Sequence, residues 1–256
     1  MGTKIETIYV DIQTPLLLST RQEHERILKL WEDYLPECLP DKYGNSEPVD
    51  LTFDLTKRDE ILNHFRWPLL AVKAKPRVRA SVWMRSPKKL LHSSWKLSFT
   101  LGEVNVDRLN QFLRASAKEL AADFCCLTLF TDAEIDFGRR NRTAWNLDKK
   151  ATKFQFDIYS QFLQQCLPDV YWTTIFGAPY VKMFGKQKLL SAPAYRVEAL
   201  NDSLVSIQLT ESLENVKANP IAFAETKMQL KSFLGEDAFF RPGKLGQCKC
   251  PDFVWK

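Results

Sequence analysis

Residues 167–190 read LPDVYWTTIFGAPYVKMFGKQKLL, and we expect the rest of the chain to be arranged around them. Pro168 suits the first position of a helix, and Gly177 and Gly185 each suit the left-handed residue just past a short helix. The stretch therefore predicts two or three short helices folded on one another. The stretch is dense in large apolar side chains: Tyr171, Trp172, Ile175, Phe176, Tyr180, Val181, Met183 and Phe184. Tyr171, Trp172 and Phe184 would supply large apolar area to a shared core. This pattern predicts a shape and not an activity.

Length and composition are those of an ordinary globular protein. The chain has 256 residues, of which 45% are hydrophobic and 26% are charged, so a core can form without disulfides or metals. The net charge of +5 comes from 36 basic and 31 acidic residues. That balance is mild for a dedicated nucleic-acid-binding protein, whose basic residues usually form a stripe.

The first residues and the cysteines point to a reduced, cytoplasmic protein. The N-terminal MGTKIETIYVDIQ has no basic segment leading into an apolar run, as a secretory signal would have. No apolar stretch approaches the roughly 18 residues needed to span a bilayer, so we expect no membrane association. The cysteines are too sparse for a disulfide framework in a chain of this length. They are Cys38, Cys125, Cys126, Cys166, Cys248 and Cys250.

Hydrophobic periodicity predicts a mixture of strands and helices in the first half of the chain. Alternation predicts strands at 8–12, 49–55, 78–84 and 95–101. Thr20 and Glu23 form a capping box that begins a helix, which Pro36 and Pro40 end, and residues 35–48 are predicted to be a loop. A short helix is expected around 61–65 and a longer amphipathic one at 106–120. The continuous apolar run FCCLTLF at 124–130 predicts a strand buried on both faces.

The second half is predicted in the same way. A short capped helix is expected at 131–138 and a strand at 153–159. Asn201, Asp202 and Ser203 predict a tight hairpin between strands at 194–200 and 204–209. A last helix begins at Asn219 and ends at Gly235, with its buried side at Ile221, Phe223, Leu230, Phe233 and Leu234. The class is therefore α+β, with a largely antiparallel sheet packed with amphipathic helices. We treat residues 1–256 as a single α+β domain and leave open whether it consists of two similar sheet-plus-helix halves.

No motif in the sequence specifies a catalytic or metal site. Cys248 and Cys250 are closer together than the cysteines of zinc knuckles, and no second Cys or His pair accompanies them. No nucleophile elbow accompanies any of the histidines, which are His24, His64 and His92, and we interpret each as a surface or packing residue. Neither a dinucleotide-binding nor a Walker glycine pattern occurs. The triplet Glu225-Thr226-Lys227 resembles a nuclease element but falls in the last helix, so we predict no catalytic residue, metal or cofactor.

Two basic regions are candidates for partner binding. The first contains Lys73, Lys75, Arg77 and Arg79 around one strand. The second surrounds an aromatic ring and supplies the predicted partner-binding residues: Arg139, Arg140, Arg142, Trp145, Lys149 and Lys150. Basic residues with an aromatic between them can hold a nucleic-acid backbone and stack a base. A solvated loop and a site for an acidic protein partner are the other two interpretations.

The aromatic stretch and the hairpin after it resemble bacterial immunity proteins of polymorphic-toxin and type VI secretion systems. The residues that carry the resemblance are YWTTIFGAPYVKMFGKQKLLSAPAYRVEAL at 171–200 and VSIQLT at 205–210. Upstream, VWMR and WKLSF before the amphipathic helix fit the same order of elements, so the resemblance extends over about 67–240. It implies a cytosolic, non-catalytic protein that neutralises a cognate toxin, with no catalytic residues to carry over. The positive net charge departs from inhibitors of basic nucleases, which are often acidic, and this argues against a nuclease target.

The primary hypothesis is therefore an interaction protein whose partner is a cognate toxin. One alternative is a metal-dependent hydrolase acting on nucleotides or nucleic acid through dispersed His and Asp residues. The other is a nucleic-acid-binding module, whose binding would fall steeply with salt.

Overall fold

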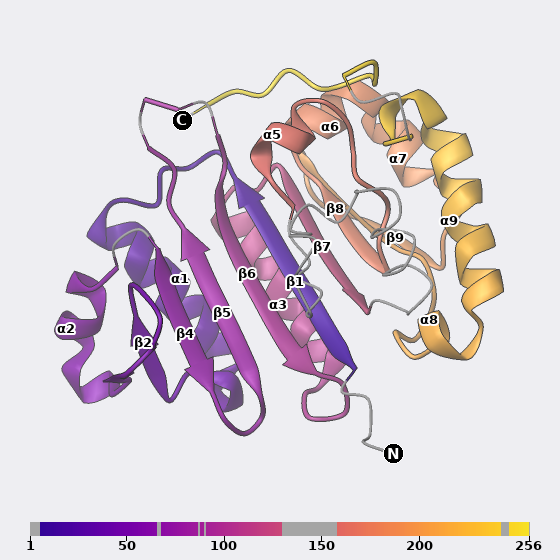
Figure 1. The fold of residues 1–256 in the computed structure, drawn as a ribbon. Helices are drawn as coiled ribbons and strands as arrows, with labels where there is room; N and C mark the ends of the chain where they lie inside the picture. Colours follow the sequence, from indigo (N-terminus) through magenta and orange to yellow (C-terminus); the bar gives the residue numbers. More distant parts are fainter. Residues whose placement is uncertain are drawn as a thin grey trace, which may run out of the picture. The chain divides into compact units, whose positions relative to one another are not determined.

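The computed structural model describes residues 6–65, 68–86, 88–89, 91–129, 158–241 and 246–255. The chain divides into two compact units (Figure 1), the first formed by residues 1–125 with 254–256 and the second by residues 126–253. That residues 1–256 form a single domain stays a prediction. The helix expected at 131–138 lies outside the described residues, as does the predicted strand at 153–159 except for its last two positions.

An antiparallel sheet forms the frame of the first unit. Its strands follow the order β3-β2-β4-β5-β6-β1. Their bounds are β1 (Thr7–Thr14), β2 (Lys42–Gly44), β3 (Leu51–Thr52), β4 (Leu69–Lys73), β5 (Val78–Trp83) and β6 (Ser93–Thr100). Alternate residues face the same side of a strand, and Val10 pairs with Leu97, which in turn pairs with Ala80. All three are buried, so this face of the sheet packs into the core of the unit.

Two helices cover that buried face. The helices of this unit are α1 (Arg21–Tyr34), α2 (Arg58–Asn63) and α3 (Val106–Glu119), with short 3-10 turns η1 (Pro36–Cys38) and η2 (Leu55–Lys57). Trp95 of β6 joins α1 to α3, because its ring meets Trp31 at 5.8 Å and Phe112 at 4.9 Å between ring centroids. Figure 1 shows α1 and α3 on the same side of β4, β5 and β6. The capping box of Thr20 and Glu23 is present at the start of α1, as predicted.

Three parts of the first unit differ from the sequence predictions. The loop predicted at 35–48 contains β2, and β4 was not predicted. The strand predicted at 49–55 is only two residues long, and both residues of β3 are exposed. Asp54 ends the extended segment by capping η2. Its carboxylate accepts hydrogen bonds from the backbone N–H of Thr56 at 2.9 Å and from the Thr56 hydroxyl at 2.7 Å.

The second unit also has antiparallel strand pairs, so the predicted α+β class with largely antiparallel pairing is confirmed. The strands β8, β10 and β9 are neighbours in that order, with β10 antiparallel to both others. The elements are β7 (Phe124–Leu129), α5 (Ser160–Leu163), β8 (Thr173–Phe176), α6 (Ala178–Phe184), α7 (Lys186–Leu190), β9 (Arg196–Asn201), β10 (Leu204–Gln208), α8 (Asn215–Ala218), α9 (Pro220–Leu234) and the 3-10 turn η3 (Glu236–Ala238). The hairpin of β9 and β10 and the buried strand β7 are as predicted.

The aromatic stretch at 167–190 is partly a strand and not only helices. Residues Thr173–Phe176 form β8 and pair with β10, and Pro168 begins no helix. Gly177 precedes α6 and does not end a helix, whereas Gly185, with φ +88°, separates α6 from α7 as expected. The predicted burial of the large aromatic side chains is confirmed: Tyr171, Trp172 and Phe184 are all buried.

The last helix, α9, has the predicted ends but a narrower buried side. Phe223, Leu230 and Leu234 are buried, whereas Ile221 is 76% exposed and Phe233 is 36% exposed. Lys227 and Lys231 lie beside this buried row and form ion pairs with Asp169, at 2.5 Å and 3.3 Å. Within the described ranges, no helix has both the length and the apolar character needed to cross a bilayer.

Candidate functional site

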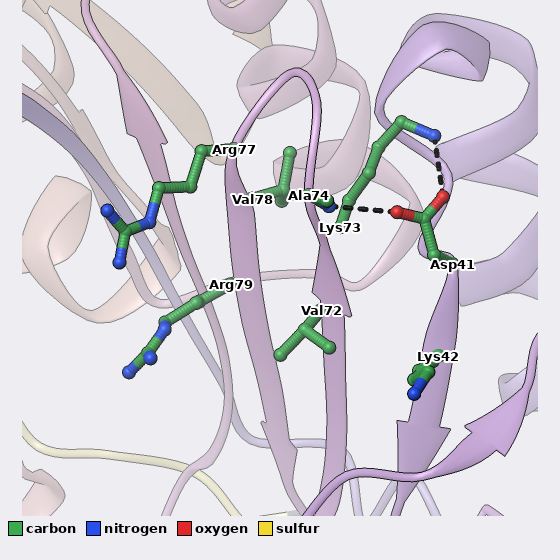
Figure 2. A pocket seen from close by; sticks show the side chains of 8 residues that line it. All are labelled: Asp41, Lys42, Val72, Lys73, Ala74, Arg77, Val78 and Arg79. Atoms are coloured by element: carbon green, nitrogen blue, oxygen red, sulfur yellow. Dashed lines mark hydrogen bonds and ion pairs between the residues drawn. The ribbon is translucent and has the colours of Figure 1, made fainter.

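The basic residues predicted around one strand lie on the hairpin of β4 and β5. Val78 is buried and separates Arg77 from Arg79, so the two arginines extend on the same, exposed side (Figure 2). Arg79 pairs with Val72 of β4, and Val72 pairs with Lys42 of β2. Lys42, Val72 and Arg79 therefore form a row across three neighbouring strands.

These strands surround an open pocket of about 480 Å³. We call it the basic pocket; its lining residues are Asp41, Lys42, Val72, Lys73, Ala74, Arg77, Val78 and Arg79. The lining contains no hydroxyl, thiol or imidazole group. Four of its side chains are cationic, namely those of Lys42, Lys73, Arg77 and Arg79, and they suit the binding of an anion.

Asp41 and Lys73 neutralise one another within the basic pocket. The Lys73 ammonium lies 3.2 Å from the Asp41 carboxylate, which also accepts the Ala74 backbone N–H at 2.8 Å. The Ala74 hydrogen bond and the Lys73 charge together hold the pKa of Asp41 below its usual value. The carboxylate therefore stays ionised at neutral pH and ties the beginning of β2 to the end of β4.

Three cations of the basic pocket have no such compensation. Lys42, Arg77 and Arg79 are exposed, and none of them forms an ion pair with another described residue. A carboxylate is nearby, because Glu103 accepts the backbone N–H of Arg77 at 2.6 Å. The excess charge of the basic pocket is nevertheless positive, and the planar guanidinium groups of its two arginines can each bind a carboxylate in bidentate fashion.

Sequence analysis identified only part of this pocket. It located Lys73, Arg77 and Arg79 but missed Lys42, the first residue of β2, and Asp41, the residue before it. A three-residue strand between prolines gives almost no periodic signal, so only the pairing with β4 reveals it. The other predicted partner-binding residues lie outside the described residues: Arg139, Arg140, Arg142, Trp145, Lys149 and Lys150.

Each histidine has a packing partner of its own, as predicted. His24 Nε2 lies 3.0 Å from the Leu18 carbonyl oxygen, and burial lowers the pKa of this imidazole. His64 meets the ring of Tyr43 edge-on at 5.4 Å. The buried His92 lies 3.1 Å from the carboxylate of Asp123. In the part of the chain that the structure describes, no three His, Cys, Asp or Glu side chains are grouped so that they could hold a metal ion.

The cysteines are all free thiols. The predicted packing role of Cys125 and Cys126 is confirmed, since both are fully buried. Cys248 lies beside Cys166, whose pKa is raised mainly by burial and further by its thiol neighbours. Burial likewise raises the pKa of Cys250 to about 11. The thiols of Cys166 and Cys250 therefore stay protonated at neutral pH and are weak nucleophiles.

The chain is similar in fold to a solved structure, but its sequence matches no protein-family model. No protein-family model matches the sequence, and no curated protein matches it either. Among solved structures, the chain is similar to the Pseudomonas aeruginosa T6SS protein PA0821, with a TM-score of 0.56 and 11% sequence identity. The similarity covers 90% of this chain and 72% of that chain. At so low an identity the likeness is one of fold, and the chain shares that fold with a protein of the type VI secretion system.

Proposed function

We propose that this chain is an immunity-type protein of a type VI secretion system, which binds and neutralises a cognate toxin effector in the cytoplasm. The observation that carries the proposal is the fold shared with the T6SS protein PA0821 over 90% of the chain. The resemblance of residues 171–200 to immunity proteins supports the same function from the sequence.

The proposed protein acts by binding and not by catalysis. His24 and His92 lie at hydrogen-bond distance from the Leu18 carbonyl and the Asp123 carboxylate, and His64 packs against Tyr43. Burial raises the pKa of the Cys250 thiol. An inhibitor needs a stable body and an accessible surface, and the basic pocket supplies such a surface. A specific interface of this kind buries about 1,200–2,000 Å².

Co-expression with the product of the neighbouring gene tests this function. We expect the neighbouring gene, expressed alone in a heterologous bacterium, to stop growth, and this chain to restore growth when expressed with it. The two proteins should also co-purify. A matched control is an unrelated immunity protein expressed at the same level, which should restore nothing. Growth arrest that this chain leaves unchanged, together with a failure to co-purify, would reject the proposal.

A further inference from the structure

We propose that the basic pocket is the docking site for an acidic segment of the toxin, with Lys42, Arg77 and Arg79 contacting its carboxylates. This inference rests on the proposed function and adds to it the surface that is used and the chemistry of the partner. The observation behind it is an excess of positive charge. Three exposed cations line one pocket, and no described carboxylate forms an ion pair with them.

The spacing of the cations suits neighbouring acidic side chains. Arg77 ends the turn before β5 and Arg79 is the second residue of β5, so a single residue separates them along the chain. Lys42 lies two strands away from Arg79, or about 10 Å at the usual strand separation. An extended or helical segment with two or three acidic residues can satisfy all three cations at once.

The pocket is held in shape before any partner binds. Val78 anchors the strand between the arginines in the core, and it pairs with both Lys73 and Phe99. The Asp41 carboxylate bridges the Lys73 ammonium and the Ala74 N–H, which fixes the beginning of the turn (Figure 2). Binding therefore requires ordering of the exposed side chains and little rearrangement of the backbone, which favours affinity.

The surroundings of the pocket favour a short acidic protein segment over a nucleic acid. A nucleic-acid backbone is a continuous row of charges, and proteins that bind it present a correspondingly long basic stripe. Here the carboxylate of Asp41 lines the pocket on one side, and that of Glu103 lies beside Arg77 on the other. The positive surface is therefore short, which suits an acidic segment of a few residues better than a continuous phosphate chain.

The first test uses the full chain and its neighbouring gene product. The variant Arg77→Glu/Arg79→Glu reverses the charge of two side chains of the basic pocket. The variant Lys88→Glu/Lys89→Glu is a control that changes the net charge of the protein equally. The control lysines are exposed and lie beyond the other end of β5. We expect the pocket variant to bind the toxin at least about tenfold more weakly and to lose protection, while the control matches wild type. Circular dichroism and urea unfolding confirm that both variants fold.

Failure of this inference can be told from failure of the proposed function. If wild type protects and the pocket variant protects equally well with unchanged affinity, the docking site is wrong and the function stands. If wild type does not protect at all, the function is wrong, and the pocket is then tested with a probe that needs no toxin.

That probe is a labelled hexaglutamate peptide, compared with a hexathymidylate oligonucleotide by fluorescence anisotropy at low salt. We expect the peptide to bind wild type and the control variant alike, at least about tenfold more tightly than it binds the pocket variant, with an affinity that falls as salt is added. Absence of peptide binding to wild type would overturn the inference. Tighter binding of the oligonucleotide than of the peptide would overturn it in favour of a nucleic-acid partner.

Discussion

The carboxylate of Asp169 lies against two ammonium groups of α9, at 2.5 Å from Lys227 Nζ and 3.3 Å from Lys231 Nζ. Burial by itself raises the pKa of this carboxyl, but the two lysines outweigh it, and the pKa lies below its ordinary value. Because the folded pKa is depressed, the stabilisation is complete above the unfolded pKa of about 4 and is lost as the pH falls through the folded pKa. Asp169 therefore ties α9 to the segment before β8 at neutral pH.

Replacing this carboxylate should destabilise the fold in a pH-dependent way. We expect Asp169→Asn to lower the free energy of unfolding by about 1–3 kcal/mol at pH 7, because two partly buried ammonium groups lose their counter-ion. The loss relative to wild type should shrink as the pH falls below about 4, where wild type also loses the charge. Urea unfolding at several pH values measures both quantities.

The matched control for this prediction is Asp202→Asn. Asp202 also pairs with a lysine, Lys186 at 3.1 Å, but its side chain is fully exposed. An exposed pair contributes little, so the control should unfold like wild type. Equal losses in the two variants, or a loss for Asp169→Asn that does not depend on pH, would contradict this account of Asp169.

A local signal in the sequence determines where helix α1 begins, and α1 in turn contributes to the core. The Thr20 hydroxyl accepts the Glu23 N–H at 3.3 Å, and the Glu23 carboxylate accepts the Thr20 N–H at 2.9 Å. This capping box begins the helix that carries Trp31 to its contact with Trp95. Local hydrogen bonding and core packing therefore act on the same element.

We expect Thr20→Ala to lower the free energy of unfolding by about 1 kcal/mol, because the orphan N–H groups of the first turn lose their acceptor. Ser19→Ala is the control, since Ser19 is exposed and lies one residue outside the cap. Chemical denaturation followed by tryptophan fluorescence measures both variants. A Thr20→Ala variant as stable as Ser19→Ala would mean that packing alone begins this helix.

Elements with a strong local signal were predictable from the sequence. The alternation of Val78, Ala80 and Val82 predicted β5, and the helical spacing of Leu109, Phe112 and Leu113 predicted α3. The elements that were missed or misassigned depend on distant partners. Strand β2 is three residues long and depends on pairing with β4. Residues Thr173–Phe176 become a strand because β10 supplies the matching edge, which the nearby helix-ending glycines do not reveal.

The residues of the basic pocket were likewise predictable only where they are close together in the sequence. The arginines of the β4–β5 hairpin were recognisable as a basic cluster, because they are close in the sequence. Their connection to Lys42, and the neutralisation of Lys73 by Asp41, depend on the order of strands and could not be read from spacing. The sequence thus predicted the positive charge of part of the basic pocket but not which strands line it.

At the scale of the whole molecule, large side chains are buried in packing while three cations of the basic pocket remain exposed. Trp95 in the first unit and Trp172 in the second are both buried, and the indole N–H of Trp172 donates to the Thr210 carbonyl at 3.1 Å. The net charge of +5 includes Lys42, Arg77 and Arg79 of the basic pocket, for which the described part of the chain supplies no ion-pair partner. This combination suits a stable inhibitor that attracts an acidic partner, with the attraction weakening as salt is added.

The proposed immunity function requires stoichiometric binding of a toxin and not turnover. Titrating a fixed amount of purified toxin with this protein, while the toxin activity is measured, tests that requirement directly. We predict that the activity falls linearly and reaches zero near one equivalent, and that it returns when the complex is separated under denaturing conditions and the toxin is refolded. Complete inactivation by a small fraction of an equivalent, or no loss of activity at a large excess, would contradict the account.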